Sequence, residues 1–374
     1  MNNICIGILT FHNAMNYGAI LQCYALQEFL DKIGFTVKVI NYTPNKFKLI
    51  YNDPKDFSAR VSLKRKIKNS ILWCIRFKST LKKSRKFNAF NYFITSRFFL
   101  TEPIIENSCI ELNKQIDIFI VGSDQVWSAP LTDYDETYFL NFVAEDKKKI
   151  SYAASLKTQN DEGTEELIKN YLPSFDAISV REQNAVGYLK EKFGINSVCV
   201  LDPTFLLTHD KWLQVANEKC KRVNGKYILI YLVSQQEKLL DYAFDYAKSH
   251  KLIIISLSPL KGKRGYKDFS DSSIEQFLGL INNAECVFTT SFHGLALSIN
   301  LHTDFYFEVS DNSHNNNDRL LDITQKLGLS NRNVVNGIAD KDIDWDEVES
   351  KLNILRNKSM DFLENAIGME SNEK

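Results

Sequence analysis

The chain has 374 residues, more than one hydrophobic core usually serves, so its length predicts two domains. Basic and acidic residues are equal in number, 46 of each, so the overall charge favours no particular class of partner. Its seven cysteines are scattered without a C-x-x-C pair, which argues against disulfides and a zinc site and is typical of a reducing compartment. Without a signal peptide or an apolar run near the about 20 residues of a spanning helix, we expect a cytoplasmic protein that is at most peripheral to a membrane.

The first 200 residues alternate between short apolar runs and segments with helical spacing. Residues 4–11 and 35–40 predict strands, and residues 19–33 between them predict a helix that Gly34 ends. This start is typical of a parallel α/β sheet, in which ligand-facing loops follow the carboxyl ends of strands. Further strands are predicted at 117–121, 150–155, 177–180 and 198–201, and further helices at 165–172 and 183–193.

Polar residues follow several of these predicted strands. Ser123 and Asp124 come after the strand at 117–121, and the later strands are followed by Ser155, Arg181 and Asp202. Because the carboxyl ends of parallel strands meet at one edge of a sheet, we expect these side chains to gather there. Two interpretations are open for Asp124: it caps its own turn, or it contacts a ligand.

The second half predicts another α/β domain. Its strands are expected at 227–233, 252–257, 286–290 and 305–307, with helices at 236–249, 273–282, 318–327 and 344–366. The predicted organisation is an N-terminal domain at 1–204, a C-terminal domain at 205–343, and a final helix with a polar tail at 344–374. Neither the phosphate-binding pattern G-x-x-x-x-G-K-[ST] nor the dinucleotide pattern G-x-G-x-x-G occurs, which argues against nucleotide hydrolysis and against a dinucleotide-dependent oxidoreductase.

The stretch 286–299 carries the most specific local signal. An apolar, β-branched run meets Thr-Thr-Ser and turns into a segment with helical spacing, which predicts Ser291 as an N-cap and His293 in the first helical turn. A helix N-terminus suits an anion, and a histidine there can donate a hydrogen bond or a proton to it. A purely structural, hydrogen-bonding histidine is the alternative.

Residues 57–101 form an insertion of different composition. They contain twelve Lys or Arg and no Asp or Glu, with aromatic residues interleaved, and since the whole chain is neutral the remainder carries a charge of −12. The pattern predicts amphipathic helices whose basic face rests on anionic lipid or binds a lipid-linked substrate. The alternative is a solvated helical face with its aromatics in the core, and a nucleic-acid partner is not expected.

Six motifs in this order resemble the polysaccharide pyruvyl transferase family. They lie at 16–26 (NYGAILQCYAL), 121–127 (VGSDQVW), 151–155 (SYAAS), 178–182 (ISVRE), 200–204 (VLDPT) and 291–294 (SFHG). The resemblance implies two Rossmann-like domains with parallel sheets, in a GT-B-like arrangement with the active site in the inter-domain cleft. It implies transfer of a pyruvyl unit from phosphoenolpyruvate (PEP) to two hydroxyls of a sugar, releasing phosphate. The sugar, for which galactose is one candidate, would belong to a capsular or exopolysaccharide and be lipid-linked in some cases.

The resemblance also assigns expected site residues. The PEP-binding arginine and histidine of the family fall on Arg181 and His293. The expected PEP-binding residues are Arg181, Ser291, His293, Gly294 and Arg319, the expected catalytic residues are His293 and Asp124, and the expected acceptor-binding residues are Asn16, Tyr17, Ser123 and Asp124. We expect no metal and no cofactor besides the donor.

Two positions depart from the family pattern. Some members have arginine two residues before the histidine, where this chain has Ser291, and Arg319 is a candidate to supply the missing cation. The SYAAS motif is often followed two residues later by glycine, where this chain has Lys157. Two other functions remain open from the sequence: a GT-B glycosyltransferase with a sugar-nucleotide donor, and a binding or scaffold protein at a membrane where polysaccharide is assembled.

Overall fold

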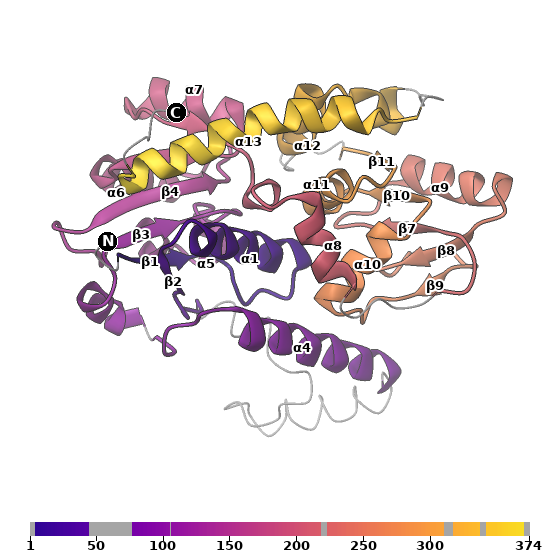
Figure 1. Ribbon diagram of the computed structural model, residues 1–374, viewed down its shortest axis with the longest axis horizontal. Helices are drawn as coiled ribbons and strands as arrows, with labels where there is room; N and C mark the ends of the chain where they lie inside the picture. The colour runs from indigo at the N-terminus through magenta and orange to yellow at the C-terminus, as the bar shows by residue number, and fades with distance from the viewer. Residues whose placement is uncertain are drawn as a thin grey trace.

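The computed structural model describes residues 4–44, 77–104, 106–217, 223–309, 317–336 and 342–369. Two parallel sheets lie next to each other, each covered by helices (Figure 1). The strand order is β2-β1-β3-β4-β5-β6 in the first sheet and β11-β10-β7-β8-β9 in the second. The expected α/β fold, with two Rossmann-like domains that each contain a parallel sheet, is confirmed.

The first sheet consists of β1 (Cys5–Leu9), β2 (Thr36–Val39), β3 (Ile118–Val121), β4 (Lys148–Ala154), β5 (Ala177–Val180) and β6 (Val198–Cys199). Its helices are α1 (Tyr17–Lys32), α4 (Phe77–Arg97), α5 (Ala129–Thr132), α6 (Glu162–Tyr171) and α7 (Gln183–Phe193), with 3₁₀ turns η1 (Glu106–Lys114), η2 (Glu136–Phe139) and η3 (Leu172–Ser174). Every residue of β1 and β3 is buried, because helices cover both faces of the sheet.

The second sheet consists of β7 (Tyr227–Tyr231), β8 (Ile253–Ser256), β9 (Lys267–Asp268), β10 (Cys286–Thr289) and β11 (Phe305–Phe307). Its helices are α8 (His209–Asn217), α9 (Glu237–Ser249), α10 (Ile274–Asn282), α11 (Phe292–Asn300), α12 (Asn317–Leu327) and α13 (Trp345–Ile367), with turns η4 (Pro203–Phe205), η5 (Ser330–Arg332) and η6 (Val334–Asn336). The sequence predicted all of these strands and helices except β9 and α8.

Each sheet reverses its winding direction at one point. Strand β1 lies between β2 and β3, and strand β7 lies between β8 and β10. At such a point, the loops that follow two neighbouring strands diverge and leave a crevice for a ligand. Ser123 and Asp124 follow β3, and Ser291 follows β10, so the topology places three of the predicted site residues at the two switch points.

One of the hydrophobic clusters spans both domains and forms a shared core between them. The ring of Tyr17, at the start of α1, stacks on Phe277 of α10 with 4.2 Å between centroids, and its hydroxyl donates a hydrogen bond to the carbonyl of Ser272 at 2.8 Å. The same cluster contains Phe90 of α4 and Leu229 of β7. Because this contact is apolar and continuous, we expect the two domains to keep a fixed relationship.

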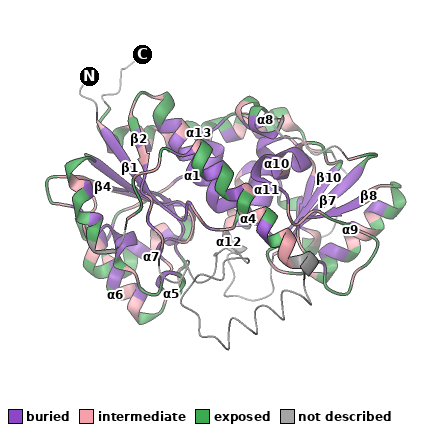
Figure 2. Cartoon of the chain, turned by 90° about the horizontal axis from the view of Figure 1, so that it is seen from below, coloured by how far each residue is buried: buried purple, intermediate pink, exposed green. Residues whose placement is uncertain are grey.

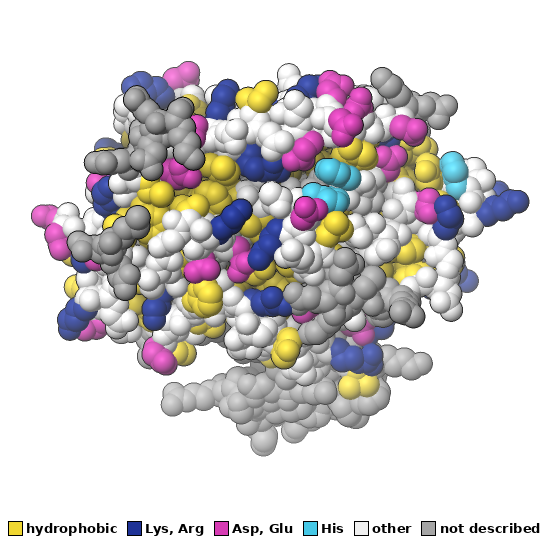
Figure 3. Space-filling model, viewed as in Figure 1, with side chains coloured by type: hydrophobic (Ala, Val, Ile, Leu, Met, Phe, Trp, Pro, Cys, Tyr) yellow, Lys and Arg dark blue, Asp and Glu magenta, His cyan; other side chains and the backbone are white. Residues whose placement is uncertain are grey.

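Helix α4 is the described part of the basic insertion, whose residues 57–76 lie outside the described ranges. It crosses the junction of the two domains (Figure 2). Lys82 pairs with Asp268 at 2.7 Å and Arg85 with Asp271 at 3.3 Å, while Phe90 is fully buried. Part of the basic face is therefore paired within the protein. No described helix has the length and apolar character needed to cross a membrane, and basic and acidic side chains are interspersed over the face in Figure 3.

Helix α13 runs back along both halves of the molecule (Figure 1). Leu352 near its start belongs to the shared core, and Leu363 near its end packs with Ile120 and Tyr152 of the first sheet. The hydroxyl of Ser359 accepts a hydrogen bond from the backbone of Leu201 at 2.9 Å. The final helix thus packs against both domains and connects the second domain to the first.

Candidate functional site

The first component of the site is the start of helix α11. Ser291 is its N-cap, with extended backbone, and its side chain accepts a hydrogen bond from the backbone N–H of Gly294 at 3.3 Å. His293 lies in the first helical turn, as the sequence predicts, and is 6% exposed. Gly294 contributes its backbone N–H to the cap, and a Cβ there would lie 2.4 Å from the hydroxyl of Thr289. The helix therefore begins in a tightly packed turn at the edge of the second sheet.

Arg181 follows β5 and is 4% exposed. Its Nη1 donates hydrogen bonds to Asp202 Oδ2 at 2.5 Å and to the Ser123 hydroxyl at 3.2 Å. Its Nε and Nη2 are buried and have no hydrogen-bond acceptor among the described residues. These two nitrogens carry three N–H groups, and the nearby carboxylate of Glu182, 3.7 Å from Nε, makes no hydrogen bond to them. Buried N–H groups without an acceptor are costly, so this edge of Arg181 suits an anionic ligand.

Asp202 connects the two domains. Its Oδ2 accepts a hydrogen bond from the Ser123 hydroxyl at 3.0 Å and lies 3.5 Å from Nε2 of His293. Its Oδ1 accepts from the backbone and the hydroxyl of Thr204, at 3.0 and 2.8 Å. Burial alone would raise the pKa of this carboxyl, but the charges of His293 and Arg181 hold the pKa below its ordinary value. Asp202 is therefore ionised at neutral pH.

Arg319 of α12 lies beside Arg181. The guanidinium carbons of Arg181 and Arg319 are 4.6 and 5.7 Å from the ring centroid of Phe292. Burial, together with repulsion from Arg181, lowers the pKa of Arg319 to about 10. Glu182 lies near both cations, 3.7 Å from Nε of Arg181 and 3.9 Å from Nε of Arg319. The carboxylate of Glu182 offsets part of the repulsion between the two guanidiniums, and an anionic ligand would offset more of it.

Asp124 faces this group from the first domain. Its backbone has a φ of 68°, in the left-handed region, and its Oδ1 accepts a hydrogen bond from the N–H of Gln125 at 2.9 Å. Its charge raises the pKa of Arg181 as one of several carboxylates around that cation, after Asp202 and Glu182. A non-glycine residue in this backbone region is costly and recurs at functional sites. Asp124 thus caps its own turn and also lies within electrostatic reach of the arginines.

Two of the other residues expected to bind the acceptor are buried within the protein. The Ser123 hydroxyl bonds to Ala153 as well as Asp202 and is fully buried, and Tyr17 is 1% exposed in the shared core. Asn16 is exposed, and its Oδ1 caps α1 by accepting a hydrogen bond from Gly18 at 2.9 Å. Their contact with an acceptor stays a prediction.

Three residues near the site were missing from the set predicted by sequence: Glu182, Tyr231 and Phe292. Asp202 was expected at this edge of the sheet, but without a specific role. Tyr231 ends β7, and its phenol interacts with the side chain of Ser291 and with the charge of Asp124. Burial raises the pKa of Tyr231 to about 12, so the phenol stays protonated. The strand ends at the second switch point were a signal that could have identified Tyr231.

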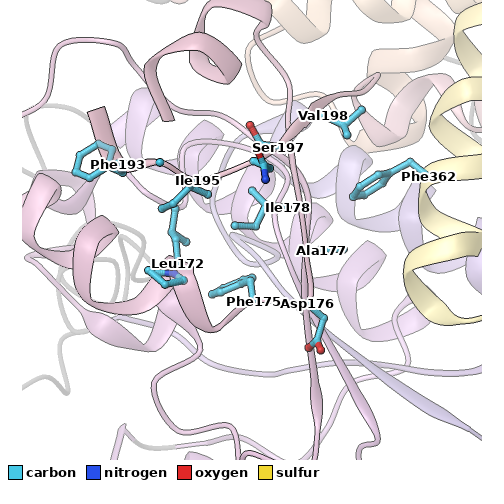
Figure 4. A pocket seen from close by; sticks show the side chains of 13 residues that line it. Leu172, Phe175, Asp176, Ala177, Ile178, Phe193, Ile195, Ser197, Val198 and Phe362 are labelled. Atoms are coloured by element: carbon cyan, nitrogen blue, oxygen red, sulfur yellow. The ribbon is translucent and has the colours of Figure 1, made fainter. Parts of the chain in front are cut away.

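Within the described ranges, His, Cys, Asp and Glu side chains form no group of three that could hold a metal ion. A hollow of about 570 Å³ lies elsewhere, at the amino end of β5 (Figure 4). Leu172, Phe175, Ile195 and Phe362 contribute to its apolar lining, and Asp176 is its acidic residue. Without a cation, this hollow does not suit an anionic ligand, and it lies at the strand end opposite to the arginines.

Comparison with curated proteins gave no match. Among solved structures, the UDP-GlcNAc 2-epimerase of Methanocaldococcus jannaschii, in complex with UDP-GlcNAc and UDP, is 15% identical, with 95% of this chain and 92% of that chain covered and a TM-score of 0.48. A putative UDP-N-acetylglucosamine 2-epimerase from Listeria monocytogenes is 12% identical, with 97% and 91% covered and a TM-score of 0.49. The E. coli heptosyltransferase WaaC is 12% identical, with 84% of this chain and 91% of that chain covered and a TM-score of 0.38.

The family comparison is more specific than these structural similarities. The model of the polysaccharide pyruvyl transferase family matches residues 16–312. The matched range contains all six motifs and the site residues from Asn16 to Gly294. The chain therefore belongs to the polysaccharide pyruvyl transferase family and is a transferase.

Proposed function

We propose that the protein transfers a pyruvyl unit from PEP to two hydroxyls of one sugar residue in a polysaccharide precursor. The alkene carbon of PEP takes a proton, one sugar hydroxyl adds to C2, and the second displaces phosphate. The sugar thereby gains pyruvate less one water, and inorganic phosphate leaves. The observation that carries this proposal is the pair of guanidiniums of Arg181 and Arg319, buried and largely buried, which both lie beside the ring of Phe292.

PEP carries a phosphate and a carboxylate, and both need cationic or N–H partners. The free Nε–Nη2 edge of Arg181 has the geometry for a bidentate contact with either group. Arg319 supplies a second cation with a free Nε, in place of the arginine that other family members have at the position of Ser291. The N-terminus of α11 adds a partial positive charge. Together these features suit a donor with two anionic groups better than one with a single charge.

Proton transfer needs a donor for the alkene carbon and a base for the acceptor hydroxyl. His293 lies at the start of α11, within 3.5 Å of Asp202, and is our candidate for the proton donor or for the residue that holds the departing phosphate. Asp124, across from the arginines, is our candidate to orient or deprotonate the hydroxyl. General acid and base catalysis of this kind contributes about 10²–10⁴-fold in rate.

The acceptor side of the proposal rests on the basic insertion at 57–101. We expect an acceptor on a lipid carrier, with the enzyme at the cytoplasmic face of the membrane, in capsular or exopolysaccharide synthesis. Three basic residues of α4 are engaged within the protein, Lys82, Arg85 and Lys86, so the attraction must come from the others. Binding to vesicles with anionic lipid should weaken as salt rises. Equal binding to neutral vesicles would contradict a charge-based membrane contact.

The direct test of the donor site is thermal unfolding with PEP, with UDP-sugars and inorganic phosphate as parallel ligands. A ligand at about 100 times its dissociation constant stabilises the folded protein by about 2.7 kcal/mol, a visible shift. We expect PEP to give the largest shift, and Arg181→Ala to remove it. Arg264→Ala, which removes an exposed arginine of the second domain, is the matched control and should respond like the wild type.

Stabilisation by a UDP-sugar but not by PEP would contradict the proposal and favour the glycosyltransferase alternative. If PEP alone gives no shift, the titration is repeated with galactosides present, because donor binding can depend on the acceptor. A PEP response that is the same in Arg181→Ala and the wild type would contradict the assigned site.

A further inference from the structure

Asp202 is the most connected buried group of the site, and no role in the reaction has been assigned to it above. Its side chain is fully buried, and both carboxylate oxygens are used. Thr204 holds Oδ1 through its backbone N–H and its hydroxyl, at 3.0 and 2.8 Å. Oδ2 is shared by Arg181 at 2.5 Å, Ser123 at 3.0 Å and His293 at 3.5 Å. Oδ2 of Asp202, in the first domain, thus contacts Arg181 of the same domain and His293 of the second domain.

We propose that Asp202 is the positioning residue of this site, which fixes the guanidinium of Arg181 and the imidazole of His293 relative to each other across the two domains. The inference rests on the proposed pyruvyl transfer for the identity of that substrate. Asp202 does not contact the donor itself. It acts through its two partners, which come from β5 and α11.

The contact with Arg181 decides which edge of the guanidinium is free. Because Asp202 and Ser123 both engage Nη1, the Nε–Nη2 edge is left without an acceptor. If the guanidinium were rotated so that another of its nitrogens contacted Asp202, a different pair of nitrogens would face the anionic groups of PEP. Asp202 therefore selects the anion-binding face of Arg181.

The contact with His293 decides which ring nitrogen carries the hydrogen. Nε2 of His293 is buried and lies 3.5 Å from Asp202 Oδ2, without a hydrogen bond to any described residue. Because the nearest acceptor is an ionised carboxylate, the Nε2–H tautomer is assigned to neutral His293, with the lone pair on Nδ1. The ring is confined on its Nδ1 side, where a Cβ on Gly18 would lie 2.0 Å from that atom. The imidazole is held between Asp202 and helix α1.

The test uses the full-length protein and Asp202→Asn, which keeps the shape of the side chain and removes its charge. The ring signals of His293, assigned by comparison with His293→Gln, are recorded by NMR without ligand. The charged group in contact with the ring is Asp202, while Arg181 and Tyr152 lie near that carboxylate. We expect the nitrogen chemical shifts of the His293 ring to change in Asp202→Asn because the carboxylate no longer selects the tautomer, and turnover to fall about 100-fold.

Glu349→Gln is the matched control, because Glu349 lies 3.5 Å from Nε2 of His302 outside the site. This variant should change the ring signals of His302 and leave those of His293 and turnover unchanged. Nitrogen chemical shifts of His293 that are the same in Asp202→Asn and the wild type would overturn the proposal, and so would wild-type turnover in Asp202→Asn.

A measurement on the unaltered protein covers the case in which Asp202→Asn does not fold. The nitrogen chemical shifts of neutral His293 distinguish its two tautomers: the Nε2–H form supports the positioning role, and the Nδ1–H form overturns it. Neither NMR readout needs PEP. If PEP fails to bind or turn over while the ring signals of His293 still depend on Asp202, the proposed function is wrong and the positioning role stands.

Discussion

Gly18 of helix α1 lies directly against the imidazole of His293 in the other domain. A Cβ at Gly18 would be 2.0 Å from Nδ1 and 2.2 Å from Cγ of that ring. The first turn of α1 and the first turn of α11 therefore meet at the site. Close packing against His293, and not a left-handed φ, is what requires glycine at this position of the NYG motif.

Replacing Gly18 by alanine should displace His293 from Asp202 and abolish most turnover. Ring and methyl cannot share the space, and displacements of about 1 Å at a site cost about 100-fold in rate. Steady-state turnover with PEP measures this. Gly187→Ala in α7 is the control, because a Cβ there meets only Glu191 Oε1 at 4.0 Å. We expect that variant to be active and slightly more stable, by about 0.5–1 kcal/mol. An active Gly18→Ala enzyme would contradict the geometry.

Tyr231→Phe should lower turnover more than stability. The ring packs against Tyr17 and Phe277, at 5.9 and 5.2 Å between centroids, and these contacts remain in the variant. What is lost is the phenol that interacts with Ser291 at the cap of α11. Kinetics and denaturant unfolding are measured on the same preparations. Tyr227→Phe is the control: it removes a 2.9 Å hydrogen bond to Leu280 at the other end of β7, so it should cost about 1 kcal/mol and no activity. Equal turnover in the two variants would refute a role for the Tyr231 phenol.

Lys86 of α4 should give the protein a pH-dependent stability. Its ammonium lies 4.4 Å from the ring centroid of Tyr17, and burial lowers the pKa of Lys86 to about 8 from an ordinary 10.5. Between pH 8 and 10.5 the unfolded chain keeps this proton and the folded protein releases it, so the free energy of unfolding rises with pH. Relative to Lys86→Met, the wild type should gain about 2–3 kcal/mol across this interval by denaturant titration.

Lys83→Met is the control for Lys86, because Lys83 is an exposed lysine on the same helix. It should follow the wild type at every pH. A wild-type curve parallel to that of Lys86→Met would show that Lys86 keeps an ordinary pKa in the folded protein.

Arg319→Met should make the free protein more stable and weaken its stabilisation by PEP. Because burial and Arg181 lower the pKa of Arg319 to about 10, its charge is unfavourable in the free protein, and removing it should stabilise that form by about 1–3 kcal/mol. The same change should remove most of the stabilisation by PEP. Thermal unfolding with and without PEP measures both effects, and Arg264→Met should show neither. An Arg319→Met protein that is less stable alone and equally stabilised by PEP would contradict this account.

The strands and helices were predictable because their patterns are local. The apolar run before Ser291 and the helical spacing after it gave β10, the N-cap and the place of His293. The two-residue strand β9 was missed because so short a pairing has no periodicity of its own. Helix α8 was also missed, although its Trp212 is fully buried.

The site could be predicted in part for the same reason. Arg181, His293 and Arg319 were identifiable by residue type and motif, and the structure brings them together around Phe292 and Asp202. Asp202 contacts both Arg181, 21 positions before it in the chain, and His293, 91 positions after it. These are tertiary contacts, which a single sequence does not contain. The burial of Tyr17 and the packing of Gly18 on His293 likewise depend on how the domains meet.

The most direct test of the central claim is product analysis with PEP and a panel of lipid-linked and free glycans. We predict that one phosphate is released for each PEP consumed, that a glycan gains the mass of pyruvate less one water, and that both are lost in Arg181→Ala. Transfer of a sugar from a UDP-sugar, without a pyruvyl product from PEP on any glycan of the panel, would contradict the account.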